Sequence, residues 1–392
     1  GNILSKIYLE AAAEAGYEIN NDMNGYKQEG FGLMDTTIFD GKRQSTSVTY
    51  LHPIKQRQNL TLITNIQVSK IIIENSSAIG VEIKNKNELE KIFAEKEVLL
   101  SAGAINSPQI LMLSGVGPEE ELKNHGINVI SALNGVGENL QDHLETYVQY
   151  ECTKPVTLYS SFNPINMALI GMQWFLFKKG IAAHSNLEIG GFIRTNEMVD
   201  YPNMQYHFFP SLVIDHGRQN PSCHAFQAHV GPMRPTSRGF VKLKSSNPID
   251  SPRIQFNYMQ TEHDLNEMRE GIKIARNIFH QKAFDHYRGK EISPGENINS
   301  DDGLNNFIRS KGDTAYHPSC TCKMGNDDMS VVDQNLKVYG VEKLRVVDAS
   351  IMPNIVSGNL NATTVMIAEK ASDLIQNKIT AEKVNIEFYK AS

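Results

Sequence analysis

A strand that runs directly into a helix constrains the fold of this chain more than any other feature of its sequence. The stretch EVLLSAGAINSPQILMLSG, residues 97–115, begins with an apolar run and continues with a helical pattern. Asn106 or Ser107 is placed to cap this helix, and Pro108 suits its first turn. The small residues at the junction let backbone N–H groups approach a phosphate closely, although they also suit tight packing. The stretch therefore predicts a βα unit.

Further strands are predicted on both sides of this unit. Between residues 60 and 100, β-branched runs such as VSKIII and AIGVEI are separated by turn-prone segments. Between residues 145 and 260, short alternating stretches such as MQYHFF, HAFQAHV and GFVKLKS are separated by Pro and Gly. The first pattern predicts a strand-rich region, and the second predicts an antiparallel sheet that forms a second domain.

Helices are predicted by apolar residues at helical spacing over residues 3–14, 262–280 and 363–377. The most apolar long stretch is MALIGMQWFLF, residues 167–177. It has about half of the ~20 residues that a membrane-spanning helix needs. We expect it to contact a membrane without crossing it, and two lysines follow it directly.

Size, composition and charge exclude several classes of protein. The 392 residues are 40% hydrophobic and 21% charged, which indicates a globular chain with two or three domain-sized units. The net charge of −6 and the lack of a long basic run argue against a nucleic-acid-binding surface. Four scattered cysteines are too few for a disulfide framework and favour a reducing compartment.

A histidine three residues before a Cys-x-Cys pair, in HPSCTCKMG at residues 317–325, is the first candidate for chemistry. His317, Cys320 and Cys322 offer at most three soft ligands to zinc, and cysteines two apart in an extended chain point to opposite faces. A disulfide between the two thiols would strain the S–S geometry. This leaves His317 as a catalytic base or as a structural histidine. Pro318 restricts the backbone conformation of His317. The zinc alternative predicts stoichiometric metal in the purified protein.

A second candidate site lies where the last predicted helix begins. Polar groups concentrated at a helix N-terminus suit an anion or the polar edge of a cofactor. The stretch VVDASIMPNIVSGNLNATT places four such residues on the approach to this helix: Asp348, Asn359, Asn361 and Thr363.

These motifs resemble the glucose-methanol-choline (GMC) family of flavin alcohol oxidoreductases, and within it the branch that oxidises choline in bacteria. The resemblance covers residues 1–378. It rests on five segments in the same order as in the family: GAINSPQILMLSGVG, GVGENLQDHLE, LEIGGFIR, YHPSCTCKMG and VVDASIMPNIVSGNLNATTVMIAEK.

The resemblance implies a fold with two parts. An α/β domain binds FAD, and an α+β substrate domain with an antiparallel sheet covers the substrate side of the flavin ring. We expect residues 1–144 to be the FAD-binding part, residues 145–310 the substrate-binding part, and residues 311–392 a return to the FAD domain that carries the active-site residues.

The resemblance also implies which residues form the site. His317 matches the active-site histidine of the family, and Asn361 matches its partner. Glu188 matches a position that binds the substrate cation, with a surface or ion-paired carboxylate as the alternative. Val68, which is also an ordinary strand residue, matches an adenosine contact. The other residues implied to bind the cofactor are Ala102, Gly103, Asp348, Ala349, Ala362 and Thr363.

The activity implied is the oxidation of choline to betaine aldehyde by hydride transfer to FAD, for glycine betaine synthesis. A quinone or another electron acceptor would then reoxidise the flavin. This places the protein peripherally on the cytoplasmic side of a bacterial membrane, or in the cytoplasm. An oxidoreductase for an uncharged alcohol and an inactive C-terminal fragment or subunit are the alternatives.

One feature of the family is absent from the sequence. Its members begin with a strand, a GxGxxG turn and a helix that hold the FAD pyrophosphate, and no such motif occurs here. The first residues, GNILSKIYLEAAAEAGY, contain neither an initiating Met nor a signal peptide. We therefore expect an incomplete FAD-binding domain that lacks its N-terminal Rossmann unit, and a separate FAD-binding segment as a partner.

Overall fold

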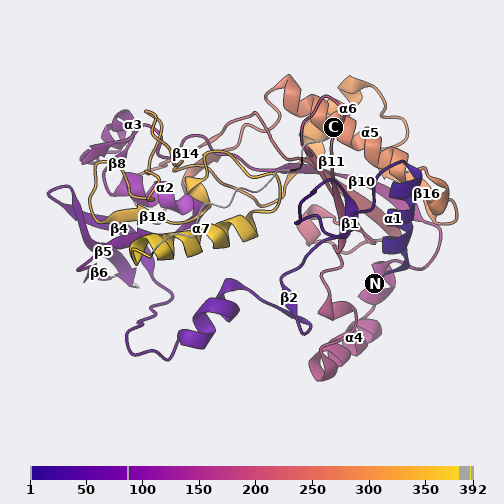
Figure 1. Ribbon diagram of the computed structural model, residues 1–392, viewed down its shortest axis with the longest axis horizontal. Coiled ribbons are helices and arrows are strands. Elements are labelled where there is room, and N and C mark those ends of the chain that lie inside the picture. The colour runs from indigo at the N-terminus through magenta and orange to yellow at the C-terminus, as the bar shows by residue number, and fades with distance from the viewer. Residues whose placement is uncertain (1, 86–87, 379–388, 390–392) are drawn as a thin grey trace.

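The computed structural model describes residues 2–85, 88–378 and 389. They form two lobes side by side, each with its own hydrophobic core (Figure 1). The first lobe contains a large antiparallel sheet, and the second contains smaller sheets and the last helix, α7 (Leu360–Ile375). The chain passes between the two cores more than once, so residues far apart in the sequence meet where the lobes adjoin.

The large sheet confirms the predicted antiparallel sheet for MQYHFF and HAFQAHV, whereas residues Phe240–Lys242 of GFVKLKS lie in a separate two-stranded sheet. The strand order of the large sheet is β1, β11, β12, β13, β10 and β16, each antiparallel to its neighbours, and β17 pairs with β10. The bounds of these strands are β1 Gly30–Leu33, β10 Leu144–Cys152, β11 Ile189–Ile193, β12 Met204–Phe209, β13 Ala225–Pro232, β16 Arg288–Ser293 and β17 Asp313–Thr314.

The two faces of this sheet differ because side chains alternate along each strand. On β12, Met204, Tyr206 and Phe208 are buried in the core of the lobe. Gln205 and His207 lie between them and line a cavity on the other face. The same alternation gives that face further polar side chains from β10 and β13: Glu145, Tyr147, Gln149, Gln227 and His229. One face of the sheet is therefore apolar and the other is polar.

Helices cover the apolar face. In α1 (Ile3–Glu14), Tyr8 stacks on Phe208 with ring centroids 4.6 Å apart. Three further helices belong to this lobe: α5 Glu262–Phe279, α6 Asp301–Lys311 and α4 Pro164–Phe177. The apolar side of α5 is buried, as its spacing predicts. By contrast α4 extends from the lobe, and none of its residues is buried (Figure 1).

The second lobe contains the predicted strand-rich region and the βα unit. An antiparallel sheet of β4 (Gln67–Glu74), β5 (Ser77–Asn85) and β6 (Glu88–Phe93) lies near the parallel pair β7 (Val98–Leu100) and β18 (Leu344–Val346). The remaining strands and α-helices of the described residues are short or connect these elements: α2 Gly103–Leu113, α3 Glu119–Asn124, β2 Ile38–Phe39, β3 Lys42–Arg43, β8 Val116–Gly117, β9 Ser131–Ala132, β14 Phe240–Lys242 and β15 Arg253–Gln255.

The first elements of the chain pack differently from the expected domain division, which assigns residues 1–144 to the cofactor domain. Leu4, Tyr8 and Phe31 are fully buried in the core of the large sheet. Residues 71–136, by contrast, contribute to the core of the second lobe. α1 and β1 therefore belong structurally with the large sheet, because their aromatic side chains fill its apolar face.

The predicted cap of α2 is wrong. The helix begins at Gly103, before Asn106 and Ser107, because its first turn is bound by a carboxylate distant in sequence. The backbone N–H of Gly103 donates to Asp348 Oδ2 at 2.9 Å, and the Ser107 hydroxyl donates to the same oxygen at 2.6 Å. Asp348 thus connects the helix to the end of β18.

Pro108 lies inside α2 rather than in its first turn. A proline has no N–H, so the carbonyl four residues earlier, that of Ala104, loses its helical partner. The hydroxyl of Thr321 donates to this carbonyl at 2.6 Å. Thr321 is fully buried. Its hydrogen bond replaces the missing helical one and connects the Cys-x-Cys segment to α2.

This arrangement predicts an energetic coupling between Thr321 and Pro108. We expect Thr321→Val to lower the free energy of unfolding by about 1–3 kcal/mol, because the buried Ala104 carbonyl loses its donor. In a Pro108→Ala background the loss should be clearly smaller, since the restored amide N–H can bind the same carbonyl. Urea unfolding of the four proteins measures this coupling, and equal losses in both backgrounds would contradict it.

Candidate active site

A cavity of about 290 Å³ lies between the polar face of the large sheet and the loops that precede β18 and α7. It is small and lined by both polar and apolar side chains, which suits a small-molecule ligand rather than a chain segment. The side chains that matter most for its chemistry are His143, Glu145, Tyr147, Gln205, His207, His229, Asp313, His317 and Asn359.

His317 is held in this cavity by its own backbone. The segments 141–145 and 313–319 run antiparallel and exchange hydrogen bonds between Gln141 and Ser319 at 3.0 and 3.2 Å. The N–H of His317 donates to Asp142 Oδ1 at 2.8 Å. The other oxygen of Asp142 accepts from Thr314 and Tyr258. Although burial raises the pKa of Asp142, these donors oppose that effect.

The tautomer of His317 follows from a chain of hydrogen bonds. His143 Nε2 lies 3.1 Å from the backbone carbonyl of Met233, which only accepts, so this nitrogen carries the proton. Burial lowers the pKa of His143 to about 3, with the neighbouring His317 as a further cause, so its ring is neutral. His143 Nδ1 is then an acceptor, and it lies 3.0 Å from His317 Nδ1.

His317 consequently carries its proton on Nδ1 and has an unprotonated Nε2. Burial also lowers the pKa of His317, while the carboxylates of Asp142 and Glu145 partly oppose this. A neutral imidazole with an unprotonated nitrogen on the cavity side can accept a proton from a bound ligand. The geometry therefore gives His317 the protonation state that a general base needs.

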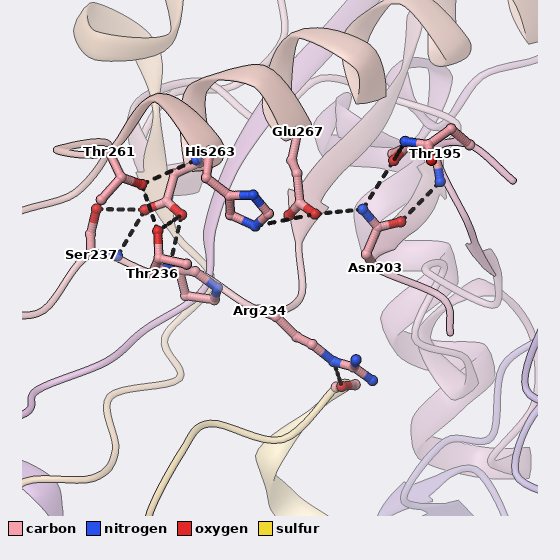
Figure 2. Close-up of polar contacts among 12 residues, drawn as sticks. Thr195, Asn203, Arg234, Thr236, Ser237, Thr261, His263 and Glu267 are labelled. Atoms are coloured by element: carbon pink, nitrogen blue, oxygen red, sulfur yellow. Dashed lines mark hydrogen bonds and ion pairs between the residues drawn. The ribbon is translucent and has the colours of Figure 1, made fainter. Parts of the chain in front are cut away.

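The Met233 carbonyl at the start of this chain is itself fixed. The N–H of Met233 donates to the Asn203 carbonyl at 2.8 Å, and the Asn203 amide donates to Glu267 at 2.6 Å, as Figure 2 shows for the side chains. Thr236 and Ser237, further along the same segment, donate backbone N–H groups to Asp264 on α5 at 2.7 and 3.0 Å. The segment that orients His143 is thus anchored to a buried helix.

Asn359 is the amide that reaches His317. Its Nδ2 lies 3.4 Å from His317 Nε2, and its Oδ1 accepts from Gln205 at 3.0 Å, which fixes the orientation of the amide. Arg234 supports the same loop by donating to Ser357 at 2.8 Å (Figure 2).

Asn361, the partner implied by the resemblance, lies elsewhere. α7 begins at Leu360, three residues earlier than predicted, so Asn361 is in its first turn and lines a larger cavity of about 1210 Å³. Asn359 lines both cavities, whereas Asn361 is among the described lining residues of the larger one alone. The pairing of Asn361 with His317 stays a prediction.

The residues implied to bind the cofactor lie in two groups. Ala362 and Thr363 line the larger cavity at the start of α7. Ala102, Gly103, Asp348 and Ala349 follow the carboxyl ends of the parallel strands β7 and β18, where open α/β sheets bind ligands. Gly103 has φ +82° with open space where a Cβ would stand, so backbone is accessible there. Val68 on β4 is half-buried against the second core.

Glu188, the implied cation contact, has a histidine as its side-chain partner. Its carboxylate lies 2.8 Å from His184 Nδ1, and its backbone carbonyl accepts from Met34 at 2.8 Å. The neighbouring Leu187 lines the His317 cavity, and Glu188 is not among the described residues that line either cavity.

Sequence reasoning missed the polar face of the sheet. Glu145, Tyr147, Gln205, His207 and His229 all line the cavity of His317. Their signal is present in the strands LETYVQY, MQYHFF and AFQAHV, where polar residues occur at every second position. Such alternation usually indicates a solvent-exposed face, so it did not by itself mark a site.

Cys320 and Cys322 are buried free thiols in the second core. Burial raises the pKa of Cys320 to about 11 and that of Cys322 still further, so both stay protonated at neutral pH. Within residues 2–85, 88–378 and 389, no cluster of His, Cys, Asp and Glu side chains is arranged to hold a metal ion.

The neutral state of His143 predicts a pH dependence of stability. A histidine in the unfolded chain has a pKa near 6.5, whereas His143 in the folded chain has a pKa of about 3. Below about pH 6.5 the unfolded state therefore binds a proton that the folded state does not, and stability falls as the pH falls. We expect His143→Gln to reduce this slope by up to ~1.4 kcal/mol per pH unit.

Urea unfolding between pH 6.5 and 4.5 measures the slope. A His286→Gln variant removes an exposed imidazole and serves as the control for the substitution itself. An unchanged slope in the His143→Gln variant would show that the folded state already binds this proton.

Two family models match the chain. Both are described as GMC oxidoreductase; the N-terminal one matches residues 1–145 and the C-terminal one residues 235–368. The match over residues 1–145 does not bear out the expectation that the chain lacks the N-terminal unit of the family, nor the expectation of an incomplete fold.

Curated relatives extend this match over the whole chain. The mitochondrial choline dehydrogenase of Mus musculus is 51% identical over 99% of this chain, which spans 65% of that protein. The human enzyme of the same name is also 51% identical, and the chain again spans 65% of its length. The oxygen-dependent choline dehydrogenase of Acinetobacter baumannii (strain AYE) is 50% identical over 100% of this chain and 72% of its own length.

Solved structures show the same fold. Pyridoxine 4-oxidase from Mesorbium loti aligns with a TM-score of 0.85 and 27% identity over 96% of this chain and 70% of that chain. Formate oxidase aligns with a TM-score of 0.89 and 25% identity over 95% of this chain and 70% of that chain. The alternating sheet, the histidine cavity and these matches agree: the chain belongs to the GMC oxidoreductase family.

Proposed function

We propose that the protein is an FAD-dependent choline dehydrogenase, which oxidises choline to betaine aldehyde for glycine betaine synthesis. The observation that carries this proposal is the unprotonated Nε2 of His317, which a chain of hydrogen bonds from the Met233 carbonyl holds toward a cavity of about 290 Å³. Its support from comparison is the set of choline dehydrogenases about 50% identical to this chain.

The residues of the cavity suit the proton transfer of an alcohol oxidation. His317 Nε2 accepts the hydroxyl proton of the substrate, which leaves a developing alkoxide on the oxygen. An amide N–H stabilises that charge, from Asn359 as the structure orients it or from Asn361 as the resemblance implies. FAD, when bound, supplies the acceptor for the hydride that leaves the same carbon.

The proposed FAD site combines the two groups of residues described above. Backbone at Ala102 and Gly103, beside Asp348 and Ala349, is accessible at the ends of two parallel strands. Ala362 and Thr363 offer the N-terminal turn of α7, whose free N–H groups favour an electron-rich edge. Val68 completes the set on β4 as a contact for adenosine.

We also propose that a quinone or another electron acceptor, rather than chiefly oxygen, reoxidises the flavin. The Acinetobacter baumannii relative is named an oxygen-dependent choline dehydrogenase. The experiment should therefore compare a quinone with oxygen as the electron acceptor. Anaerobic turnover with a soluble quinone analogue would support the proposal, and turnover with oxygen alone would contradict it.

The proposed location is the cytoplasmic side of a bacterial membrane, with α4 as the contact. None of the helices in the described part of the chain has the length and apolar character to cross a membrane. The helix presents exposed apolar side chains on most of its surface, a pattern that suits partial burial among lipids. Those more than half exposed are Ile165, Met167, Leu169, Met172, Phe175, Leu176 and Phe177.

Vesicle co-sedimentation tests this location. We expect Phe175→Asp to reduce the fraction of protein that sediments with vesicles of bacterial lipids, because a charge replaces a side chain that is 73% exposed. Equal sedimentation of the variant and the parent protein would remove α4 from the proposal.

The role of His317 has a direct test in the flavin-loaded protein. We expect His317→Ala to slow the bleaching of flavin absorbance by choline under anaerobic conditions by a factor on the order of 10²–10⁴, because the alcohol loses its base. Flavin content should stay the same. His286→Ala is the matched control, and a rate for His317→Ala within a few-fold of the control would contradict the proposed role.

A further inference from the structure

A buried carboxylate lies directly beside the histidine that is proposed as the base. Asp142 is 3% exposed, and it belongs to the segment 141–145 that runs antiparallel to the segment 313–319. Its Oδ1 accepts the backbone N–H of His317 at 2.8 Å. Burial of a charge is costly unless neighbouring groups compensate for it. The structure therefore keeps a costly charge next to His317.

The hydrogen-bond donors of Asp142 are all neutral. Besides the N–H of His317, the hydroxyls of Thr314 and Tyr258 donate to Oδ2. Burial and the charge of Asp142 both raise the pKa of Tyr258, so this hydroxyl keeps its proton and can donate. The three donors occupy both carboxyl oxygens and favour the ionised form, although burial raises the pKa of Asp142.

The other two carboxylates of the His317 cavity have different surroundings. Glu145 lies 2.9 Å from a ring nitrogen of His229, so its charge already has an imidazole beside it. Asp313 accepts from the hydroxyl of Tyr147 at 3.4 Å. Within the described residues, the hydrogen-bond partners of Asp142 include one histidine, and that histidine is His317.

The charge of His317 changes during the proposed reaction. When Nε2 takes the hydroxyl proton of the substrate, the O–H bond breaks, an N–H bond forms, and the electron pair of the broken bond stays on the oxygen. The neutral imidazole thereby becomes an imidazolium. Its ring contact, His143, is neutral and supplies an acceptor at Nδ1 but no charge. A positive charge that forms in a buried site needs a negative partner.

Asp142 is placed to be that partner. Burial is the main cause that lowers the pKa of His317, and Asp142 opposes this effect more strongly than Glu145 does. We infer that Asp142 is a positioning residue of the reaction: its buried carboxylate holds the backbone of His317 and balances the positive charge that His317 gains from the substrate. The inference rests on the proposed function, because that reaction supplies the proton.

Other titratable groups also face His317, and all of them are retained when Asp142 alone is replaced. No Lys or Arg is among the described residues that line the cavity. Burial lowers the pKa of His207 to about 4, so this ring is neutral near pH 7. The titratable side chains that line the cavity with His317 are His143, Glu145, Tyr147, His207, His229, Asp313 and Tyr316.

The experiment replaces Asp142 by asparagine in the flavin-loaded protein. The amide keeps the size of the side chain and an oxygen for the His317 N–H, and the two hydroxyls can accept from its NH₂ group. Because His317 acts unprotonated, kcat/KM for choline falls as the pH drops through its pKa. Loss of the carboxylate lowers this pKa, so Asp142→Asn should move the acid limb to lower pH by about one unit. The plateau should fall by a factor on the order of 10, because a weaker base accepts the proton less readily.

An exposed carboxylate provides the matched control. Asp302→Asn on α6 makes the same chemical change away from the cavity, and its pH profile should equal that of the parent protein. A purely structural role of Asp142 would lower the plateau and leave the acid limb in place. If the parent oxidises choline and Asp142→Asn leaves the limb in place, the inference is wrong while the proposed function stands.

A titration without turnover tests the inference in the parent protein, so it does not depend on the folding of a variant. The carboxyl ¹³C resonance of Asp142 and the ring ¹⁵N resonances of His317 can be followed as the pH falls. We expect the carboxyl resonance to shift at the pH where His317 titrates, because the two groups interact. A carboxyl resonance that does not respond there would overturn the inference. If it responds but the protein does not oxidise choline, the proposed function fails and the charge partnership stands.

Discussion

The contact between His143 and His317 is the interaction on which the candidate active site depends. It joins two segments 174 residues apart, and it works because a backbone carbonyl, that of Met233, decides which nitrogen of His143 bears the proton. With its proton on Nε2, His143 accepts a hydrogen bond at Nδ1, so His317 carries its own proton on Nδ1. His317 Nε2 is therefore unprotonated and can accept a proton. A fixed backbone group thus sets the chemistry of a side chain two contacts away.

The large sheet supports this contact from both sides. Its apolar face packs on α1 and α5, and this packing fixes the strands that carry the site. Its polar face presents Glu145 and His229 to the same cavity as His317. Because the period of a strand is two, a shift of one residue in β10 would exchange these polar side chains with core residues such as Val148. The register of the sheet is therefore a condition for the site.

The sequence predicts the elements of this fold better than it predicts the contacts between them. The helical spacing of α5 and the alternation in β12 are local, and both are confirmed. The cap of α2 was missed because the carboxylate of Asp348 comes from 245 residues away. The choice between Asn359 and Asn361 depends on where α7 begins, and helix ends are the least certain feature of a sequence pattern. Glu145 was missed because alternation in β10 does not reveal which face meets the loop of His317.

The measurement that tests the central claim most directly is the ¹⁵N NMR spectrum of the imidazole nitrogens at pH 7, with His317 assigned from the spectrum of His317→Gln. The hydrogen-bond chain predicts a neutral His317 with its proton on Nδ1 and an unprotonated Nε2. A proton on Nε2, or a charged ring, would contradict the account, because the nitrogen on the cavity side could not then act as the base.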